Sequence, residues 1–325
     1  MLNFLKKQWF VCAILLVLII SWLLPPLPDG QGQDWLKKGF IAAIFLGSGL
    51  ALRSKELLRG LGHWRLHLFI QGFSLVITAL MCWGLDQLWR SIGLDPGIRL
   101  GLLVLGALPT TVTSCVALTA AAGGNQAGAL VNASLGNLLG VIITPLWLIA
   151  VADAGEQPID LLPTLQKLGI LVIAPLLLGQ VIQALLGQRL SIERRKQCSK
   201  MGQVLLLGVM YISFQYAFHH GTAMNWGAVA ATSLICIALH GLWLLMPWYG
   251  ALLPPFRLNP GDRCCALICS SQKTLAFGLP LIAICFPQHP ALALIALPIL
   301  IYHPLQLLIG AGLAPILAKM QRRAA

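Results

Sequence analysis

The chain has 325 residues, of which 58% are apolar and only 10% are charged, and its formal net charge is +12. Its mean hydropathy of +0.83 is far above that of water-soluble domains. These values exclude a soluble domain and indicate a membrane protein with several spans. The apolar runs lack strand-like alternation and exceed the roughly 10 residues of a barrel strand, so we expect an all-α membrane protein.

The first apolar run follows Lys6 and Lys7, as in a signal peptide. Residues 21–30 read SWLLPPLPDG and contain no small-x-small cleavage site, so we expect an uncleaved first helix. The lengths of the apolar runs and their Pro/Gly boundaries predict ten transmembrane helices. The expected ranges are 9–25, 36–52, 66–86, 98–122, 125–151, 164–187, 201–218, 226–253, 263–286 and 290–317.

Lys and Arg are distributed unequally between alternate loops of this ten-helix scheme. One side holds Lys6, Lys7, Arg53, Lys55, Arg59, Arg65, Arg189, Arg194, Arg195, Lys196, Lys200, Arg257, Arg263, Lys319, Arg322 and Arg323. The other side holds Lys37, Lys38, Arg90, Arg99 and Lys167. By the positive-inside rule, we expect a multi-pass protein of the inner or plasma membrane with both termini in the cytoplasm. Lys273 falls inside an expected helix, whereas none of the carboxylates does.

Ten helices with both ends on one side divide into two halves of five, residues 1–152 and 153–325. An odd number of helices per half inverts the second half, and inverted repeats are typical of secondary transporters. The tetrapeptide Ile143-Thr144-Pro145-Leu146 recurs as Tyr302-His303-Pro304-Leu305, at an offset of 159 residues. We therefore expect the fourth and ninth helices to be repeat partners, with Ser114 opposite Lys273.

A polar break interrupts each of these two helices. In the fourth helix, Pro109 removes a backbone donor, and the polar residues that follow it are Thr110, Thr111, Thr113 and Ser114. In the ninth, the pentapeptide Ser270-Ser271-Gln272-Lys273-Thr274 interrupts an apolar run. Unwound backbone and half-helix ends coordinate ions and anionic groups in broken-helix transporters. A kink that serves only packing is the alternative for each break.

Lys273 is a cation about halfway along an apolar span, which costs at least about 2.5 to 3.5 kcal/mol on insertion scales. It must therefore face protein or water, and three roles are open. The lysine substitutes for a bound cation at carbonyl-rich half-helix ends, attracts an anionic substrate, or gains and loses a proton. Snorkelling to an interface is the alternative, and the apolar residues on both sides of the break argue against it.

Buried amides are further candidates for solute or ion binding. Asn132 and Asn137 lie on the fifth expected helix and Gln71 on the third. A four-residue spacing places one amide and three glycines on the same face of the fifth helix, namely Gly128, Asn132, Gly136 and Gly140. Close helix packing explains most of this stripe.

His240 and His303 lie inside expected helices and are candidates for a proton relay, with hydrogen-bonded structural histidines as the alternative. Enzyme motifs are lacking, so we expect no catalytic residue and no cofactor. Nine cysteines form no CxxC pair, and we expect no disulfides. Cys264, Cys265 and Cys269 have no His or carboxylate in register, which favours packing over a metal site.

Two longer motifs carry a resemblance to a known family. Residues 109–146 read PTTVTSCVALTAAAGGNQAGALVNASLGNLLGVIITPL, and residues 269–281 read CSSQKTLAFGLPL. Together with the ten expected helices, they resemble the bile acid:sodium symporter (BASS/SBF) superfamily, specifically its SBF-like branch of sodium-dependent transporters. The resemblance covers essentially the whole chain. It implies a core domain and a panel domain, with unwound fourth and ninth helices that cross.

The resemblance also implies a sodium site, which this chain matches only in part. Gln71, Ser114 and Gln272 match the family's third-helix glutamine, fourth-helix serine and ninth-helix glutamine. Cys115 replaces the family's asparagine, and Ile268 stands in place of its glutamate. The acidic ligand is missing and a lysine follows the glutamine, which argues against ordinary sodium binding because a hard cation needs carboxylates or several carbonyls.

We therefore expect a secondary active transporter of a small anionic solute that works by alternating access, with sodium or proton coupling. No cofactor is expected and sodium stays open as a coupling ion, the partners are the solute and the bilayer, and nucleic acid is excluded. The alternative is a non-transporting membrane regulator of ion or calcium homeostasis, implied by eukaryotic relatives of the same branch. The expected binding residues are Gln71, Thr110, Thr111, Thr113, Ser114, Asn132, Asn137, Ser270, Ser271, Gln272, Lys273 and Thr274.

Overall fold

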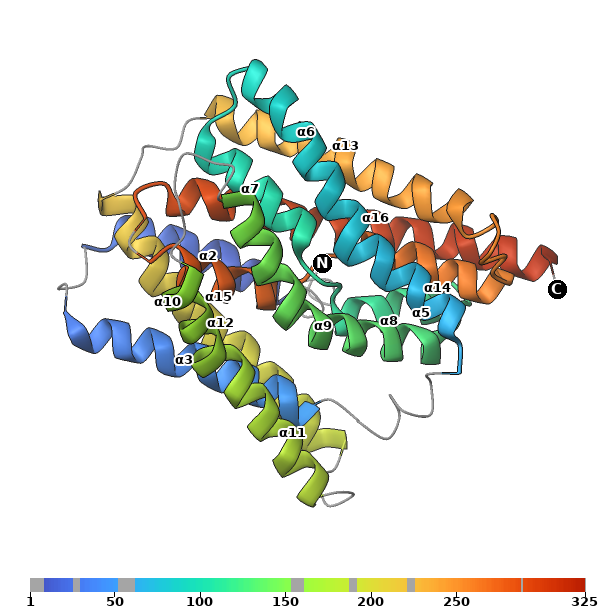
Figure 1. The fold of residues 1–325 in the computed structure, drawn as a ribbon, viewed down its shortest axis with the longest axis horizontal. Helices are drawn as coiled ribbons and strands as arrows, with labels where there is room; N and C mark the ends of the chain where they lie inside the picture. The colour runs from blue at the N-terminus through green and yellow to red at the C-terminus, as the bar shows by residue number, and fades with distance from the viewer. Residues whose placement is uncertain are drawn as a thin grey trace. The chain divides into compact units, whose positions relative to one another are not determined.

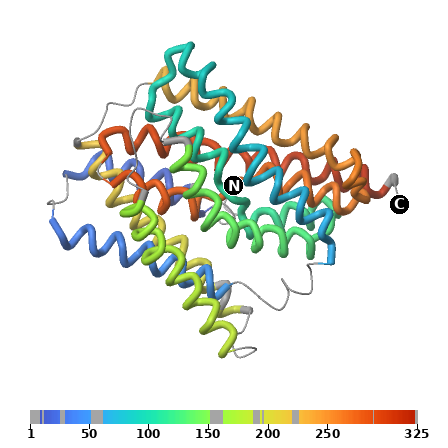
Figure 2. Tube along the Cα trace, in the orientation of Figure 1, coloured from blue at the N-terminus to red at the C-terminus, as the bar shows by residue number. Residues whose placement is uncertain are grey.

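The computed structural model describes residues 9–25, 30–51, 62–152, 161–186, 192–220, 226–287 and 289–324. These residues form helices joined by turns and short irregular segments, and none of them lies in a strand (Figures 1 and 2). The all-α prediction is therefore confirmed for the described part of the chain. Several basic residues used to predict the orientation lie outside it, namely Lys6, Lys7, Arg53, Lys55, Arg59 and Arg189.

The helices form two compact units, each with segments from both halves of the chain. The first unit contains α2 (Trp9–Leu23), α3 (Gln31–Ala51), α10 (Leu161–Leu168), the π-helix η2 (Gly169–Ile173), α11 (Ala174–Leu186) and α12 (Ile192–His220). It also contains α15 (Leu275–Cys285) from Leu279 onward and the start of α16 (Leu292–Ala324). The second unit contains α5 (Trp64–Gln71), the π-helix η1 (Gly72–Ile77), α6 (Thr78–Ser91), α7 (Pro96–Ala107), α8 (Val112–Ala121), α9 (Gln126–Ala152), α13 (Trp226–Gly250), α14 (Pro260–Ser271) and the rest of α16.

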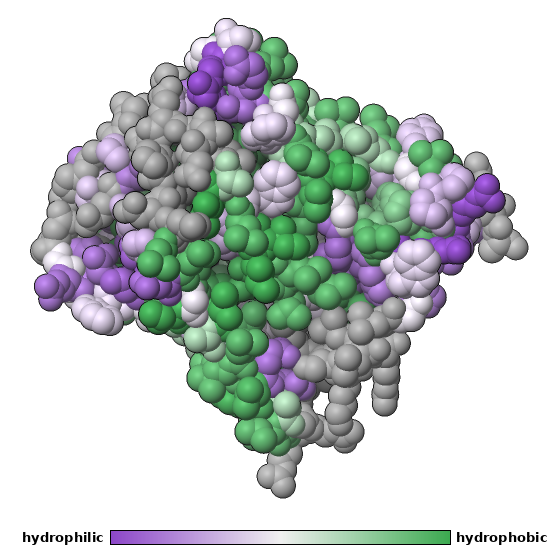
Figure 3. Space-filling model, in the orientation of Figure 1, coloured by the Kyte–Doolittle hydropathy of each residue, from purple (hydrophilic) through white to green (hydrophobic). Residues whose placement is uncertain are grey.

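Seven described helices are long and apolar enough to cross a membrane, and the bent pair α7 and α8 raises the number to eight. One of the seven combines α14 and α15 over Pro260–Cys285, and the apolar part of α2, Cys12–Leu23, is shorter. Large apolar side chains are exposed in both units, and apolar residues cover much of the face drawn in Figure 3. The chain is a multi-pass membrane protein, while the count of ten helices stays a prediction.

Four carboxylates lie inside described helices, namely Asp34, Asp86, Glu193 and Asp262. Asp86 and Asp262 lie in helices that are long and apolar enough to cross a membrane, so the prediction that spans contain no carboxylate is wrong for these two. α6 continues to Ser91, which places Asp86, the last residue of its expected range, inside the helix. α14 begins at Pro260, before the expected start at residue 263, and Asp262 lies in its first turn. Polar capping and ion pairing extend both helices past their apolar runs, which the hydropathy pattern alone does not detect.

In the first unit, α3 packs against α11 and α12. Glycines allow the closest approach: a Cβ atom on Gly49 would lie 2.3 Å from the Leu176 carbonyl oxygen, and one on Gly179 would lie 2.4 Å from the Leu46 carbonyl oxygen. Small residues of this kind allow membrane helices to pack backbone against backbone.

In the second unit, α14 is the central helix and packs against α5, α8, α9 and α13. Every residue from Cys264 to Ser271 is buried. Most of these side chains are small, so four neighbouring helices can surround α14 closely. The Cys265 and Cys269 sulfur atoms lie 4.0 Å apart, and no group of His, Cys, Asp or Glu among the described residues is arranged to hold a metal ion.

Candidate functional site

The two broken helices, α7 and α14, begin with the same local pattern, Asx-Pro-Gly-x-Arg. Residues 95–99 read DPGIR and residues 259–263 read NPGDR. The Asp95 carboxylate accepts a hydrogen bond from the Gly97 N–H at 2.7 Å, and the Asn259 side chain accepts one from the Asp262 N–H at 2.8 Å. Proline follows each cap at the first helical position, where a missing N–H costs nothing. Each helix therefore has its own start signal, 12 residues before a break.

These helix ends set the register between the two broken helices. Pro96 corresponds to Pro260 and Ala107 to Ser271, an offset of 164 residues. These starts favour an offset of 164 over the predicted 159 for this pair, which pairs Lys273 with Pro109 rather than with Ser114. The two tetrapeptides on which the offset of 159 was based lie at different distances from the starts of their helices. Pro145 follows the start of α9 by 19 residues, whereas Pro304 follows the start of α16 by 12. The repeated Asx-Pro-Gly-x-Arg start is the signal that sequence reasoning missed.

The arginines of these starts tie each broken helix to the preceding helix. Arg99 donates from Nε and Nη2 to the two carboxylate oxygens of Asp86 on α6, both at 2.9 Å. Arg263 donates from Nε to the Trp248 carbonyl oxygen on α13 at 2.8 Å, and its guanidinium lies 3.6 Å from the Trp248 ring centroid. The first contact is a bidentate ion pair and the second a cation–π contact. The two arginines thus occupy the same position of the shared pattern and both contact the preceding helix, but through different kinds of interaction.

The chain bends by 62° between α7 and α8. Carbonyls at such a helix end need donors from elsewhere. Two donors lie on α9: the Thr144 hydroxyl donates to the Ala107 carbonyl at 2.7 Å, and the Asn137 amide donates to the Thr110 carbonyl at 3.1 Å. The predicted binding residue Asn137 therefore supports the backbone of the first break.

The two breaks contact each other directly. The Thr274 N–H donates to the Pro109 carbonyl at 2.9 Å. The Ser114 hydroxyl donates to Gln272 Oε1 at 3.3 Å and lies 2.6 Å from the Thr111 hydroxyl. Both backbone and side chains therefore join residues that the sequence places more than 150 positions apart.

The Lys273 ammonium lies within a ring of four oxygen atoms. Its Nζ lies within hydrogen-bond distance of the Ser74 carbonyl at 2.6 Å, the Leu108 carbonyl at 2.8 Å, the Thr78 hydroxyl at 2.9 Å and the Gly106 carbonyl at 3.0 Å, and these four acceptors share its three protons. Two of these carbonyls belong to the C-terminal end of α7, where the helix dipole is negative. The lysine side chain is 0% exposed.

This geometry discriminates between the roles considered for Lys273. The ammonium does not snorkel, because it is enclosed by protein. Its contacts with three carbonyl oxygens and one hydroxyl oxygen are those expected of a bound metal cation. Its Nζ also lies 5.1 Å from the ring centroid of Trp243, which is a cation–π contact. Because the side chain is enclosed, a solute has no direct contact with it in this conformation.

Gln306 on α16 holds the Lys273 backbone from both sides. The Lys273 N–H donates to Gln306 Oε1 at 2.6 Å, and Gln306 Nε2 donates to the Lys273 carbonyl at 2.8 Å. The second break thereby regains a donor and an acceptor that an intact helix would supply. The sequence signal for this residue was an amide inside an apolar span, three residues after His303, and our sequence reasoning missed it.

The two candidate relay histidines contact the backbone of the second break through neighbouring side chains. Tyr302 donates its hydroxyl to the Ser271 carbonyl at 2.6 Å, so His240 Nδ1 donates to that hydroxyl at 2.8 Å. Nε2 of His240 is buried without a partner. His303 Nδ1 lies 3.1 Å from Gln306 Nε2. The His240 chain ends at a backbone carbonyl, so this structure supplies no direct link from that ring to the Lys273 ammonium.

The accessible part of the junction lies at the start of α8. Thr113 is exposed and Thr111 and Ser114 are half-buried. Thr111 occupies the N-cap position but makes no side-chain capping hydrogen bond. The first N–H groups of α8 thus remain without a side-chain cap beside three hydroxyls, and such a helix N-terminus attracts anions.

The amides Gln71 and Asn132 pair with each other. Gln71 Nε2 donates to the Asn132 carbonyl at 2.9 Å and to its Oδ1 at 3.2 Å, and His67 Nδ1 lies 3.0 Å from the same Oδ1. A Cβ atom on Gly136 would lie 2.9 Å from Gln71 Oε1, so the glycine stripe of α9 makes room for this amide. Both amides therefore connect α5 to α9.

Two positions that match sodium ligands of the family carry no carboxylate in this chain. Cys115 Sγ lies 2.9 Å from the Thr110 hydroxyl and 3.9 Å from the Ile268 carbonyl oxygen. A thiol and an apolar side chain thus stand where an amide and a carboxylate would bind a hard cation. Ser270 lies nearby in sequence, and its buried hydroxyl has no hydrogen-bond partner.

The fold and the junction define a class of protein: a multi-pass helical membrane protein in which the breaks of two interrupted helices contact each other, and interrupted helices of this kind are typical of secondary transporters. A family model described as the SBF-like CPA transporter family matches residues 8–319. The chain belongs to this family of membrane transporters.

Named relatives match nearly the whole chain. The sodium/bile acid cotransporter 7-B of Xenopus laevis is 30% identical over 321 residues, which cover 97% of this chain and 93% of that protein. The sodium/bile acid cotransporter 7 of Rattus norvegicus is 30% identical over 316 residues, with 95% and 92% coverage. The protein named "Putative symporter YfeH" of Escherichia coli is 31% identical over 283 residues, with 84% and 81% coverage.

Proposed function

We propose that this protein is a secondary active transporter of a small anionic solute that works by alternating access and is driven by a sodium or proton gradient. The observation that carries the proposal is the junction of the two breaks. Lys273 neutralises the carbonyl end of α7, while the uncapped start of α8 stays accessible. Half-helix ends that meet inside a helical bundle are the solute and ion sites of such transporters.

The proposed architecture is two inverted repeats of five helices, residues 1–152 and 153–325, arranged as a core and a panel. The shared starts of α7 and α14 support the repeat, because both helices have 12 residues and end in a break. The two compact units support the division into a core and a panel. The second unit, which contains both breaks, is the proposed core, and the first is the proposed panel.

The proposed solute site is the start of α8. The exposed Thr113 hydroxyl and the first N–H groups of the helix supply donors there. The hydroxyls of Thr111 and Ser114 bond to each other and to Gln272 in this conformation, and rotating them toward a bound anion adds two further donors. An anion gains from both the donors and the positive end of the helix dipole. Gln272 adds an amide from the other broken helix through its contact with Ser114.

Lys273 is the proposed substitute for one coupling cation. Its ring of carbonyl and hydroxyl oxygens is the coordination that an ion would otherwise receive. The names of the relatives, sodium/bile acid cotransporters, support an organic anion and a sodium gradient as the first combination to test.

The test is transport by purified protein in vesicles. Bile acids, sulfonates and dicarboxylates are first screened for a rise in the thermal unfolding midpoint, with and without sodium, since a ligand stabilises the folded state by mass action. Uptake of the stabilising compounds is then followed under imposed sodium and proton gradients. We expect gradient-driven uptake of an anion.

The matched variants separate the solute site from general damage. The double variant Thr111→Val and Ser114→Ala should lose uptake and retain its folded state. Ser91→Ala removes an exposed hydroxyl that bonds only to the Leu88 carbonyl and should leave uptake unchanged. Unchanged uptake by the double variant would rule out this solute site. A folded protein that binds an anion but gives no flux under either gradient would instead support the regulator alternative.

A further inference from the structure

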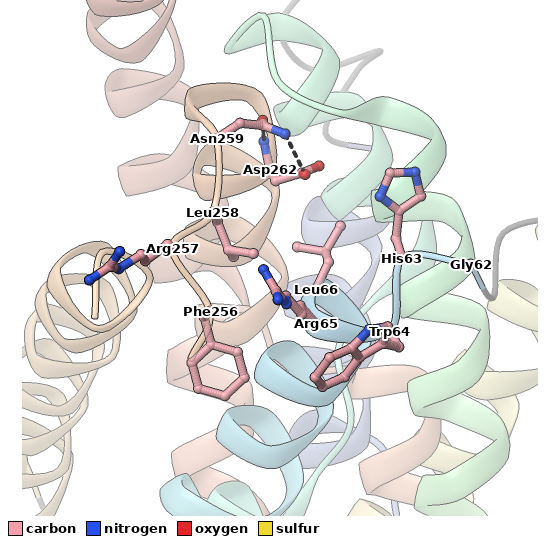
Figure 4. Close-up of a pocket in the computed structure, with 10 residues that line it drawn as sticks. All are labelled: Gly62, His63, Trp64, Arg65, Leu66, Phe256, Arg257, Leu258, Asn259 and Asp262. Atoms are coloured by element: carbon pink, nitrogen blue, oxygen red, sulfur yellow. Dashed lines mark hydrogen bonds between the residues drawn. The ribbon is translucent and has the colours of Figure 1, made fainter. Parts of the chain in front are cut away.

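A cavity of about 260 Å³ lies in the second unit where α5 and α14 begin. We call it the α5/α14 pocket. It is formed by the segment that enters α5 and by the segment that leads from α13 into α14, and it includes none of the residues of the proposed solute site. The lining residues are Gly62, His63, Trp64, Arg65, Leu66, Phe256, Arg257, Leu258, Asn259 and Asp262 (Figure 4).

The lining carries more positive than negative charge. Arg65 and Arg257 are exposed and form no ion pair with any residue that the structure describes. Asp262 is the one carboxylate of the lining, and it is 6% exposed. Its two oxygens already accept hydrogen bonds from the Asn125 amide at 2.6 Å and the Asn259 amide at 2.7 Å. Two arginines and one carboxylate therefore give the lining an excess of one positive charge, and the carboxylate oxygens are already occupied.

The side chains point in different directions. Figure 4 shows the Arg65 guanidinium in the middle of the lining, between Trp64 on one side and Phe256 on the other, whereas the Arg257 side chain points outward. The imidazole of His63 stands across the cavity from Phe256. The backbone of Arg257 has a φ of 43°, in the left-handed region that costs a residue with a side chain. Arg65 is thus the cation presented to the cavity.

Aromatic and apolar side chains surround the same end of the unit. Trp64 is 56% exposed, Leu68 57%, Tyr249 62% and Leu253 61%. Trp and Tyr beside basic residues are typical of the level of lipid headgroups. A group bound by Arg65 would therefore lie next to a surface suited to acyl chains.

We propose that the α5/α14 pocket binds a phosphate-bearing anion, with the Arg65 guanidinium as its principal contact. The planar fork of arginine donates two parallel hydrogen bonds to a phosphate, which a lysine cannot match. His63 supplies a second donor from the other wall. An anionic lipid headgroup and free phosphate share this chemistry, and the exposed apolar side chains favour the lipid.

The experiment is a binding titration on the full chain in detergent micelles. Short-chain phosphatidylglycerol, inorganic phosphate and short-chain phosphatidylcholine are each titrated while the thermal unfolding midpoint is recorded. We expect the midpoint to rise with phosphatidylglycerol. An equal rise with inorganic phosphate at the same concentration would identify free phosphate as a sufficient ligand, and no rise with it would identify the lipid. A rise of equal size with phosphatidylcholine and phosphatidylglycerol, or no rise with any of the three, would overturn the proposal.

Variants locate the binding. Arg65→Gln should weaken phosphatidylglycerol binding by about tenfold, the loss expected for one charge-assisted bidentate contact. Lys200→Gln removes the same charge from α12 in the other unit and should leave binding unchanged. Arg65→Lys keeps the charge without the fork, and it should bind with an intermediate affinity even if Arg65→Gln fails to fold. Wild-type affinity in both Arg65 variants would overturn the assignment, as would equal losses in the Arg65 and Lys200 variants.

Discussion

The two broken helices begin alike and end differently. Each begins with an Asx-Pro-Gly cap and runs for 12 residues. The first then bends by 62° across residues 108–111, whereas the second continues through residues 272–274 as one apolar span. The bent helix presents carbonyl oxygens, and the straighter one supplies the Lys273 ammonium and the Thr274 N–H that meet them.

This difference shows that the two breaks complement each other. A break in either helix alone would leave unpaired polar backbone, which is costly in a membrane. Together they satisfy each other, with help from α9 and α16. Because both helices start with the same Asx-Pro-Gly-x-Arg pattern, the division of roles comes from the residues at the breaks, Pro109 in one and Lys273 in the other.

The largest effect is expected for Lys273→Met, which removes the ammonium and keeps a side chain of similar length. The Leu108 carbonyl and one of the Ser74 and Gly106 carbonyls would lose their donor, since the single Thr78 hydroxyl proton can satisfy only one of the latter pair. At about 1–3 kcal/mol for each unsatisfied group, we expect the free energy of unfolding to fall by about 3 kcal/mol.

The measurements for Lys273→Met are thermal unfolding in detergent and uptake by vesicles. We expect uptake to be lost even below the unfolding temperature, because the junction of the two breaks would open. A variant with the stability and uptake of the wild type would show that the ammonium does not hold the two helices together.

The second effect concerns the backbone clamp. Gln306→Leu leaves both the N–H and the carbonyl of Lys273 without their side-chain partner, and we expect a loss of about 2 kcal/mol in unfolding free energy. Gln306→Glu keeps the acceptor for the N–H and loses the donor to the carbonyl, so about half of that loss should remain. Equal stability of the Leu variant and the wild type in thermal unfolding would contradict the clamp.

Variants of the two corresponding arginines test whether the starts of α7 and α14 contribute equally to the free energy of unfolding. Arg99→Ala removes a bidentate ion pair with a carboxylate that is only 19% exposed, and we expect a loss of about 2 kcal/mol. Arg263→Ala removes one bond to a carbonyl and a cation–π contact, and the loss should be about 1 kcal/mol. Chemical unfolding of both variants checks the order, and a larger loss for Arg263→Ala would reverse the comparison.

The smallest effect is expected at the α9 support of the first break. Thr144→Val removes the hydroxyl that donates to the Ala107 carbonyl and should cost about 1 kcal/mol. Thr232→Val is the matched control, because the Thr232 hydroxyl bonds to the Ala228 carbonyl within its own helix. If the two variants lose the same stability in thermal unfolding, the Ala107 carbonyl does not depend on α9.

The sequence was most informative where a local signal was complete. A described helix overlaps each of the ranges expected from hydropathy. Pro109 and the run from Ser270 to Thr274 identified both breaks. The predicted offset of 159 residues rested on tetrapeptides without helix ends, whereas the capped starts of α7 and α14 favour 164. Asn132, Asn137 and Gln71 were recognised as buried amides, but only their partners show that they support backbone and each other.

By itself, the sequence determined a multi-pass helical protein with two interrupted helices and a lysine in one of them, because apolar length and polar breaks are local properties of the chain. Tertiary structure alone decided what Lys273 does. Its four oxygen partners come from η1, α6, α7 and the first break, 165 to 199 positions away in sequence. No local pattern encodes such contacts, since they depend on how the segments around Ser74–Thr78 and Gly106–Leu108 pack against the segment that carries Lys273.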